Sequence, residues 1–516
     1  MSVNDVPRTI EQEAVDPVQP PKVDKVNRAS GGSNCQRAIF FFFTFLVGFY
    51  LVILVAGLGE AIFLRDPDVY WHVAVGQDIW LTKSLPHFDE LSHTFLGKPW
   101  IAKEWLGQLL LSGAYALEGW RGVVLLAAGA VAMAYALLFL ALARTMRVTV
   151  AVGVATLSFL FSVGDFSARP VVFSDPLIVI WVASLVKSVE TRAAPNPLLL
   201  LVMALWANLH GSFTFGLAIG GALAAEAVFD GPADQLLQRG LRWGAFLVAA
   251  LVAACVTPYG FRPILTTFQV FIGNDALNYV QEWRPATLES IGVNELSIFG
   301  LLILTLHFGV KLPFWRLIST IALVYLMFAH IRFAALFAIV TPLLLASPVA
   351  RQFPFLRLTT QLATQPQFFD AMARASRRLF YPLCCLIAGG IAAFAAYGPM
   401  AAPKSEITPS AAINYIYKED LVGNVYNSYN FGGYLIFRGI KTFIDGRSDQ
   451  LFGNGFLTRL VRITTKTPKE FIQYLDEYKV SIALVAPGGL DAQELESSSR
   501  WEMVYSDAVS VLFRKR

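Results

Sequence analysis

Long runs of apolar residues, separated by short polar connections, dominate the chain from residue 38 to residue 397. The runs are Ala38–Phe63, Gly122–Ala143, Val148–Val163, Val171–Val186, Pro197–Leu209, Phe213–Phe229, Trp243–Val256, Leu296–Val310, Leu317–Ala329, Phe333–Leu345 and Phe380–Tyr397. A helix that crosses a bilayer needs about 20 apolar residues, and the shorter runs approach that length once their flanks are included. The pattern predicts a polytopic α-helical membrane protein with about eleven transmembrane helices.

Positive charges in alternate connections indicate how these helices are oriented. Arg144, Arg239, Lys311 and Arg351 all lie on one side if Glu104–Trp120 runs along the interface instead of crossing the membrane. The positive-inside rule then places the N-terminus in the cytoplasm and the residues after 397 outside. Residues 1–37 are polar and lack aromatic side chains, so they are predicted to be a disordered cytoplasmic segment.

The pattern changes after residue 397, where the long apolar runs stop. Gly432–Phe437, Lys441–Asp445 and Val480–Val485 are Gly-Tyr-rich or alternate between apolar and polar positions, and Pro468–Glu477 has a helical pattern. The transmembrane domain is therefore assigned to residues 38–397, and residues 398–516 are predicted to form a small extracytoplasmic α/β domain.

Composition supports the membrane assignment and narrows the function. Of the 516 residues, 55% are apolar and 15% are charged, whereas a soluble domain carries about 25% charged residues. The net charge of +4 is small, and the basic residues flank apolar runs, which argues against a nucleic-acid partner. The four cysteines have neither the spacing of a zinc site nor that of a disulfide framework.

The connection after the first run, residues 64–120, is dense in ionisable and aromatic residues. Asp66 and Asp68 stand where the run ends, and Tyr70, Trp71 and His72 follow directly. A connector that only joins two helices has no structural need for these groups. We interpret residues 64–120 as a catalytic outer loop that acts on a polar group at the membrane surface.

Ionisable residues also gather at the predicted outer ends of other helices. The candidates are Asp66, Asp68, His72, Lys103, Glu104, Arg169, His210, Arg262, Glu282, Arg284, His330 and Arg332. An ionisable group at membrane depth is costly, so it points to function, although a single one is explained by interfacial anchoring. A dozen such groups on one side indicates a shared outer cleft.

The arginines of this set suit phosphate. Arg169, Arg262, Arg284 and Arg332 each present a planar fork of donors. A lipid-linked phosphate ligand explains them, and so does ordinary contact with anionic phospholipid.

The two aspartates of the loop have three interpretations. Asp66 or Asp68 could cap a helix, which is the commonest fate of such a residue. One of them could act as a general base toward a hydroxyl or amine. Together with His72 they could hold a divalent cation, for which oxygen ligands favour Mg²⁺ or Mn²⁺.

Three motifs of this loop carry a resemblance. Asp-x-x-x-Tyr-Trp (Asp66–Trp71), Lys-Pro-Trp-(x)4-Trp-Leu (Lys98–Leu106) and Gly-Trp-Arg (Gly119–Arg121) resemble the first outer loop of the GT-C superfamily of polytopic glycosyltransferases. Asp66 matches the catalytic Asp of that superfamily. The usual Asp-Glu pair is replaced here by Asp66-Pro67-Asp68, which leaves open which carboxylate is the base.

The resemblance implies a bacterial inner-membrane glycosyltransferase that takes a sugar from a polyprenyl-phosphate donor. The acceptor would be a periplasmic lipid, glycan or protein, deprotonated by Asp66 or Asp68. The four arginines would hold the donor phosphate, and His72 and His210 would bind sugar hydroxyls. A transporter or flippase of a lipid-linked saccharide is the first alternative, and a membrane scaffold for polysaccharide assembly is the second.

The outer domain adds its own polar cluster, which includes Tyr434, Asp445 and Arg447. Turn chemistry explains part of the cluster, because Asp445-Gly446 is a turn signal. A carbohydrate-binding surface is the functional interpretation. We expect the domain to cover the mouth of the cleft, with Arg447 facing it, because a lid limits hydrolysis of an activated donor.

Overall fold

The computed structural model describes residues 44–53, 62–271, 277, 279–286, 293–357, 385, 387–390, 392–393, 402–467 and 470–516. The segment predicted to be disordered, 1–37, and most of the last predicted span, Phe380–Tyr397, lie outside the described residues. The predicted span Ala38–Phe63 is described in part, and its residues Thr44–Ile53 are helical.

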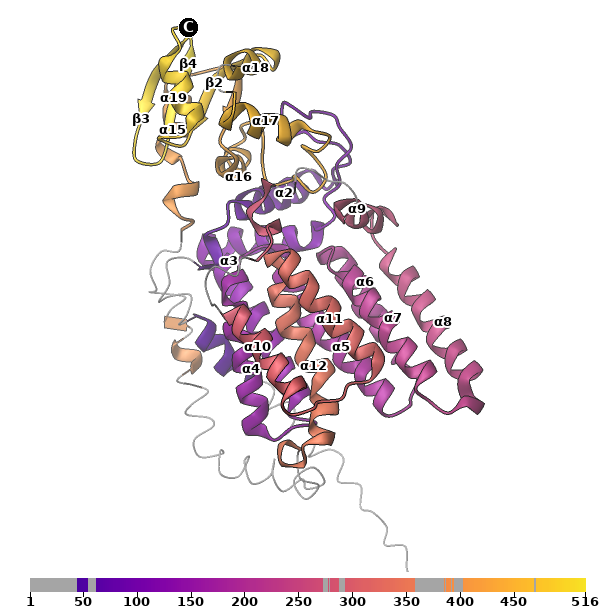
Figure 1. Ribbon diagram of the computed structural model, residues 1–516. Coiled ribbons are helices and arrows are strands. Elements are labelled where there is room, and N and C mark those ends of the chain that lie inside the picture. The colour runs from indigo at the N-terminus through magenta and orange to yellow at the C-terminus, as the bar shows by residue number, and fades with distance from the viewer. Residues whose placement is uncertain are drawn as a thin grey trace, which may run out of the picture.

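A bundle of apolar helices forms the body of the protein (Figure 1). Its helices are α3 (Trp105–Leu142), α4 (Val148–Ser162), α5 (Asp175–Glu190), α6 (Leu199–Leu209), α7 (Phe213–Phe229), α8 (Leu236–Ala254), α10 (Val293–Leu306), α11 (Phe314–Ala329) and α12 (Ala334–Gln352). Within the described part of the chain, five helical segments are long and apolar enough to cross a membrane, and four shorter apolar helices accompany them. The chain is a multi-pass membrane protein, and the number of about eleven spans stays a prediction.

One end of the bundle, which we call the domain end, carries the C-terminal domain, helix α2 (Asp68–Thr82) and helix α9 (Arg262–Phe271) (Figure 1). Helix α3 turns sharply near this end, because Glu118 and Gly119 have non-helical backbone angles. Its first part is therefore a separate helix, in the segment that the charge pattern requires to lie along the interface.

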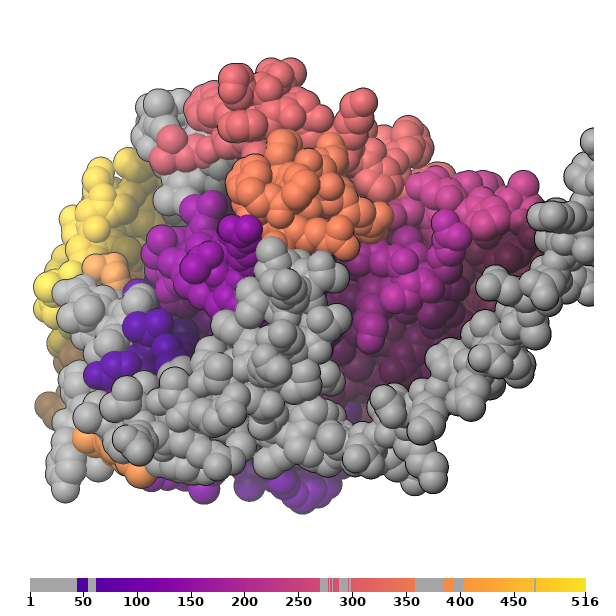
Figure 2. All heavy atoms as spheres, turned by 90° about the horizontal axis from the view of Figure 1, so that it is seen from below, coloured from indigo at the N-terminus to yellow at the C-terminus, as the bar shows by residue number. Residues whose placement is uncertain are grey.

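Seen from the opposite end, the chain around residues 334–357 packs between two other parts of the bundle (Figure 2). These are helix α4 and helix α11. Two further helices end at the domain end in a histidine with extended backbone angles, His210 after α6 and His330 after α11. The extended backbone ends the helical path at both residues.

A buried ion cluster ties four helices together far from the domain end. The guanidinium of Arg316 on α11 is almost fully buried, and its Nε lies 2.9 and 3.0 Å from the two carboxylate oxygens of Glu226 on α7. Its Nη1 donates to Glu190 of α5 at 3.3 Å and to the carbonyl of Leu344 on α12 at 3.2 Å. The cluster fixes the relative positions of these helices because every partner comes from a different one.

The C-terminal domain is built on a four-stranded sheet of order β1-β2-β4-β3. Its strands are β1 (Asn424–Asn427), β2 (Val480–Val485), β3 (Trp501–Ser506) and β4 (Val511–Lys515), and its helices are α15 (Ser410–Lys418), α16 (Gly432–Phe437), α17 (Phe456–Thr465), α18 (Phe471–Glu477) and α19 (Leu490–Ser497). Strands β1 and β2 are parallel, and the other pairs are antiparallel. The predicted α/β character and the strand Val480–Val485 are confirmed.

Two segments of this domain differ from the sequence-based expectation. Gly432–Phe437 forms helix α16, and Lys441–Asp445 makes only a single bridge, from Thr442 to Ser92 of the first outer loop. Burial in Lys441–Asp445 does not alternate: Lys441 is exposed, and the next four residues are all buried. The domain and the loop share one hydrophobic core that includes Trp71 and Trp100 from the loop and Phe443 from the domain.

The buried ion pair of Arg316 predicts that the melting temperature falls when its partner is removed. Replacing Glu226 by Gln removes the carboxylate that faces the guanidinium, and breaking a buried pair in this way costs about 3–5 kcal/mol. We expect a clear fall in the melting temperature of the protein in detergent. The double variant Arg316→Met, Glu226→Met should recover most of the loss, because Glu190 keeps its ion pair with Arg351 at 3.5 Å and no charge is left without a partner. A double variant as unstable as Glu226→Gln would contradict this.

Candidate functional site

A cavity of about 660 Å³ opens at the domain end, between the first outer loop, the ends of the bundle helices and the C-terminal domain. Nine predicted site residues line it: Asp66, Asp68, His72, Lys103, Glu104, Arg169, His210, Glu282 and Arg332. They come from the loop, from the connections after α4, α6 and α9, and from the segment that follows α11. The shared cleft expected from the charge pattern is therefore present.

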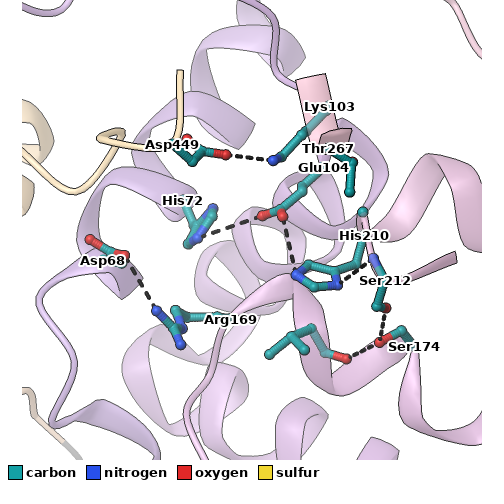
Figure 3. A network of polar contacts seen from close by, with 12 residues as sticks. Asp68, His72, Lys103, Glu104, Arg169, Ser174, His210, Ser212, Thr267 and Asp449 are labelled. Carbon is teal, nitrogen blue, oxygen red and sulfur yellow. Dashed lines mark hydrogen bonds and ion pairs between the residues drawn. The ribbon is translucent and has the colours of Figure 1, made fainter. Parts of the chain in front are cut away.

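Arg169 is the centre of one half of the site (Figure 3). Its Nη1 lies 2.7 Å from Glu282, 3.2 Å from Asp66 and 3.5 Å from Asp68. Asp66 also accepts a 2.9 Å hydrogen bond from the backbone N–H of Asp68, which holds the start of α2. Asp66 thus forms a turn just before α2 without capping the helix, and the carboxylate of Asp68 makes no such bond to the backbone within the described chain.

Three carboxylates around one guanidinium carry excess negative charge in a buried place. Burial opposes the ionisation of Glu282, but Arg169 and Arg332 outweigh it and lower the pKa of Glu282 to about 2. Burial raises the pKa of Asp66, although Arg169 opposes the shift. Burial and the neighbouring Asp66 raise the pKa of Asp68 to about 8. Glu282 therefore neutralises Arg169, and Asp68 is a carboxyl group that gains or loses its proton in the neutral to mildly basic range.

Glu104 and two histidines form the other half (Figure 3). The Oε1 of Glu104 lies 3.3 Å from Nε2 of His210, and its Oε2 lies 3.9 Å from Nε2 of His72. The backbone N–H of Ser212 donates to Nδ1 of His210 at 3.1 Å, so a neutral His210 presents its Nε2–H to Glu104. Burial lowers the pKa values of both histidines and raises that of Glu104 to about 7.

The C-terminal domain closes the cavity from above the bundle. Asp449 of the domain forms an ion pair with Lys103 of the loop, and the side-chain amide of Gln450 bonds the backbone of Ile101 in both directions at 3.0 and 3.2 Å. Tyr429 and Ser448 also line the cavity. As expected, the domain covers the cleft.

Five predicted site residues lie outside the cavity. These are Arg262, Arg284, His330, Tyr434 and Arg447. Arg262 and Arg284 are exposed, and Nδ1 of His330 is hydrogen-bonded to the carbonyl of Trp283 at 2.8 Å. Tyr434 is buried edge-on against Tyr70, with 4.9 Å between ring centroids.

The prediction that Arg447 faces the cleft is wrong. Its side chain is fully buried, with Nε and Nη2 each 2.8 Å from the carboxylate of Asp445 and Nη1 2.5 Å from Asp89. Its guanidinium also lies 4.9 Å from the ring centroid of Trp100. Two carboxylates occupy its donors, so Arg447 holds the domain to the loop.

Several residues of the cavity were not predicted from the sequence. Asp165 and Asp175 line it close to the bundle, and Asp449 lines it from the domain. Gln108, one helical turn after Glu104, lies 3.3 Å from Nδ1 of His72. An aspartate at the outer end of an apolar run, as in Ser174-Asp175-Pro176, was a signal of the same kind as those used for the other candidates.

The sequence allowed a divalent cation between Asp66, Asp68 and His72, but in the structure an arginine lies beside the two aspartates. The guanidinium of Arg169 faces both aspartates. Among the described residues, no three His, Cys, Asp or Glu side chains are grouped so that they could hold a metal ion. Binding of Mg²⁺ or Mn²⁺ stays a prediction, and no step below depends on it.

Comparisons with known proteins give the fold. No family model and no curated protein sequence match the chain. The oligosaccharyltransferase AglB from Archaeoglobus fulgidus, in complex with an inhibitory peptide and a dolichol-phosphate, is similar in structure with a TM-score of 0.53 at 13% identity, covering 88% of this chain and 70% of that chain. The same enzyme in its apo form gives a TM-score of 0.51 at 12% identity, covering 87% and 69%.

ArnT from Cupriavidus metallidurans gives a TM-score of 0.48 at 14% identity and covers 93% of this chain and 98% of that chain. At such identities the likeness to AglB shows the fold alone. The chain shares the fold of this oligosaccharyltransferase, which agrees with the resemblance of the first loop to the GT-C superfamily.

The raised pKa of Glu104 makes a prediction about stability and pH. A carboxyl group that titrates near 7 in the folded protein and near 4.3 in the unfolded chain binds more protons when folded, so stability falls as pH rises from about 4.3 to about 7. Glu104→Gln keeps the shape and removes this titration. We expect the variant to lose less melting temperature than the wild type between about pH 5 and pH 8; parallel profiles for the two proteins would contradict the assignment.

Proposed function

We propose that the protein is an integral membrane glycosyltransferase that moves a sugar from a polyprenyl-phosphate donor to an acceptor at the domain end. The observation that carries the proposal is the cavity, in which a carboxylate–guanidinium cluster and a Glu–His pair face one space at the domain end. The GT-C fold supports it. A scaffold would leave these buried charges without a task.

The cavity has a polar part and an apolar part, as a lipid-linked sugar requires. Lys103, Arg332 and Asp449 line the part near the domain, and Ile178 and Leu336 line the part inside the bundle. AglB has been solved with a dolichol-phosphate. By analogy, the lipid chain would enter from the bundle side and the sugar would lie between the Arg169 and Glu104 clusters.

Arg332 is our candidate for the donor phosphate. Arg169 faces three carboxylates, whereas Arg332 lies 3.9 Å from Glu282 and over the ring of Trp283 at 4.6 Å. A stacked guanidinium keeps its donor fork in a fixed plane, and this arrangement favours bidentate contact with a phosphate.

Asp68 is our candidate for the general base. It would take the proton of the acceptor hydroxyl or amine while that atom attacks the anomeric carbon, and the bond from that carbon to the phosphate oxygen would break with its electron pair on the phosphate. The Glu104 carboxyl, oriented by the Nε2–H of a neutral His210, would bond sugar hydroxyls with its remaining lone pairs. Asp66, which accepts the backbone N–H of Asp68, would orient Arg169.

The proposed cellular setting is the bacterial inner membrane, with a cytoplasmic N-terminus and a periplasmic C-terminal domain. The alternate placement of Lys and Arg supports this orientation. The acceptor would be a lipid, glycan or protein on the periplasmic side.

The base assignment is tested with purified protein in lipid nanodiscs and synthetic polyprenyl-phosphate sugars, with transfer followed by mass spectrometry. Asp68→Asn should lower kcat by about 10²–10⁴-fold, because an amide cannot accept the proton. The rate of the wild type should rise as the pH passes through about 8, since Asp68 must be ionised to act as a base. Full activity of Asp68→Asn would remove it from the mechanism.

The phosphate assignment has a matched control. Arg332→Lys keeps the charge but loses the bidentate fork, so we expect the KM for the donor to rise by about tenfold. Arg284→Lys is the control, because Arg284 is exposed and lies outside the cavity. Equal KM values for both variants and the wild type would reduce Arg332 to an interfacial anchor.

A further inference from the structure

The turn Asp445-Gly446-Arg447 of the C-terminal domain touches the proposed base directly. A Cβ atom built on Gly446 would lie 1.7 Å from Oδ1 of Asp68, 2.6 Å from its Cγ and 2.9 Å from its Oδ2. All three nearest atoms therefore belong to one carboxylate. The backbone of the domain reaches Asp68 only because residue 446 has no side chain.

Backbone conformation does not explain this glycine. The left-handed glycines of the described chain are Gly97, Gly119, Gly260, Gly309, Gly423, Gly439, Gly455 and Gly488. Gly446 is not among them, so its φ is one that any residue adopts. The requirement for glycine is the close approach to Asp68.

The turn is held by fully buried charges. Asp445 bonds the guanidinium of Arg447 with both carboxylate oxygens and also accepts the backbone N–H of Arg447 at 3.1 Å. Thr442 donates to the same carboxylate at 2.7 Å, and Arg447 bonds Asp89 of the first outer loop. A turn fixed in this way on both sides cannot yield easily when something presses on Gly446.

A second contact of the same kind lies one residue earlier in the loop. A Cβ on Gly433, in helix α16, would lie 2.1 Å from the carbonyl oxygen of Pro67. The domain therefore meets the Asp66-Pro67-Asp68 segment at two glycines. On its other side, the Oδ2 of Asp68 lies 3.5 Å from Arg169.

From these contacts we infer that Gly446 is a positioning residue: the C-terminal domain sets the place of the Asp68 carboxylate by confining it between the Gly446 backbone and Arg169. The inference rests on the proposed function in assigning a task to Asp68. It makes the domain a part of the catalytic centre as well as its cover. A misplacement of a reacting group by about 1 Å commonly costs about 10²-fold in rate.

The test is Gly446→Ala in the full-length protein, with Gly113→Ala as the matched control. Gly113 lies on α3, and a Cβ there meets nothing within 4 Å. We expect Gly446→Ala to lower kcat by about 10²-fold while the KM for the donor stays within about twofold, because the contact is with the base alone. Gly113→Ala should leave both constants unchanged.

A double variant separates positioning from general damage. If Gly446 acts through Asp68, adding Gly446→Ala to Asp68→Asn should change the residual rate by less than about twofold. Independent effects, in which the two losses multiply, would overturn the inference. So would a Gly446→Ala protein with the wild-type kcat.

Two further measurements test the inference without an assay of sugar transfer. A cryo-EM structure of Gly446→Ala should show the carboxylate of Asp68 displaced from Arg169, and an unmoved carboxylate would overturn the inference even if the wild type transfers no sugar. If Gly446→Ala does not fold, Asp68→Ala combined with Gly446→Ala should fold and melt like Asp68→Ala alone, because the colliding carboxylate is gone. Failure of that pair to fold would place the defect elsewhere.

Discussion

The site depends on one buried guanidinium that faces three carboxylates. Arg169 has charge enough for one of them, and Glu282, the nearest at 2.7 Å, takes that role. Burial then decides the state of the other two, because an ionised carboxylate without a partner is costly where it has lost most of its contact with water. The result is an Asp68 that can exchange a proton near neutral pH, although its side chain stands beside a positive charge.

Every layer of the fold contributes to holding this arrangement. The first outer loop supplies Asp66 and Asp68. The connection after α4 supplies Arg169, and the segment after α9 supplies Glu282. The extended histidine after α6 brings His210 to Glu104. The C-terminal domain shares a hydrophobic core with the loop and touches Asp68 through Gly446. Bundle, loop and domain are thus one structural unit around the cavity, although the sequence suggests a membrane domain followed by a separate outer domain.

The sequence predicted what depends on periodicity and on the cost of charge near a membrane. The apolar runs predicted the helical bundle. The cavity residues Arg169, His210 and Glu282 were predicted because an ionisable side chain near the membrane costs free energy and therefore indicates a function. Arg447 could not be placed in this way. The sequence of a turn that contains Asp and Arg does not indicate whether these side chains are exposed or buried. The partner of Arg447, Asp89, is 358 residues away in the sequence. Gly446 was equally hidden, since its role depends on a contact with Asp68 and not on its own backbone angles.

The most direct test of the account is a comparison of envelope lipids and glycans by mass spectrometry in cells that contain the wild-type gene, no gene, or the Asp68→Asn variant. The account predicts that loss of the gene removes one sugar from an envelope acceptor and raises the amount of a polyprenyl-phosphate-linked sugar. The Asp68→Asn cells should match the cells without the gene, provided that the variant protein is present in the membrane. Identical glycans and identical lipid-linked sugars in all three strains would contradict the account.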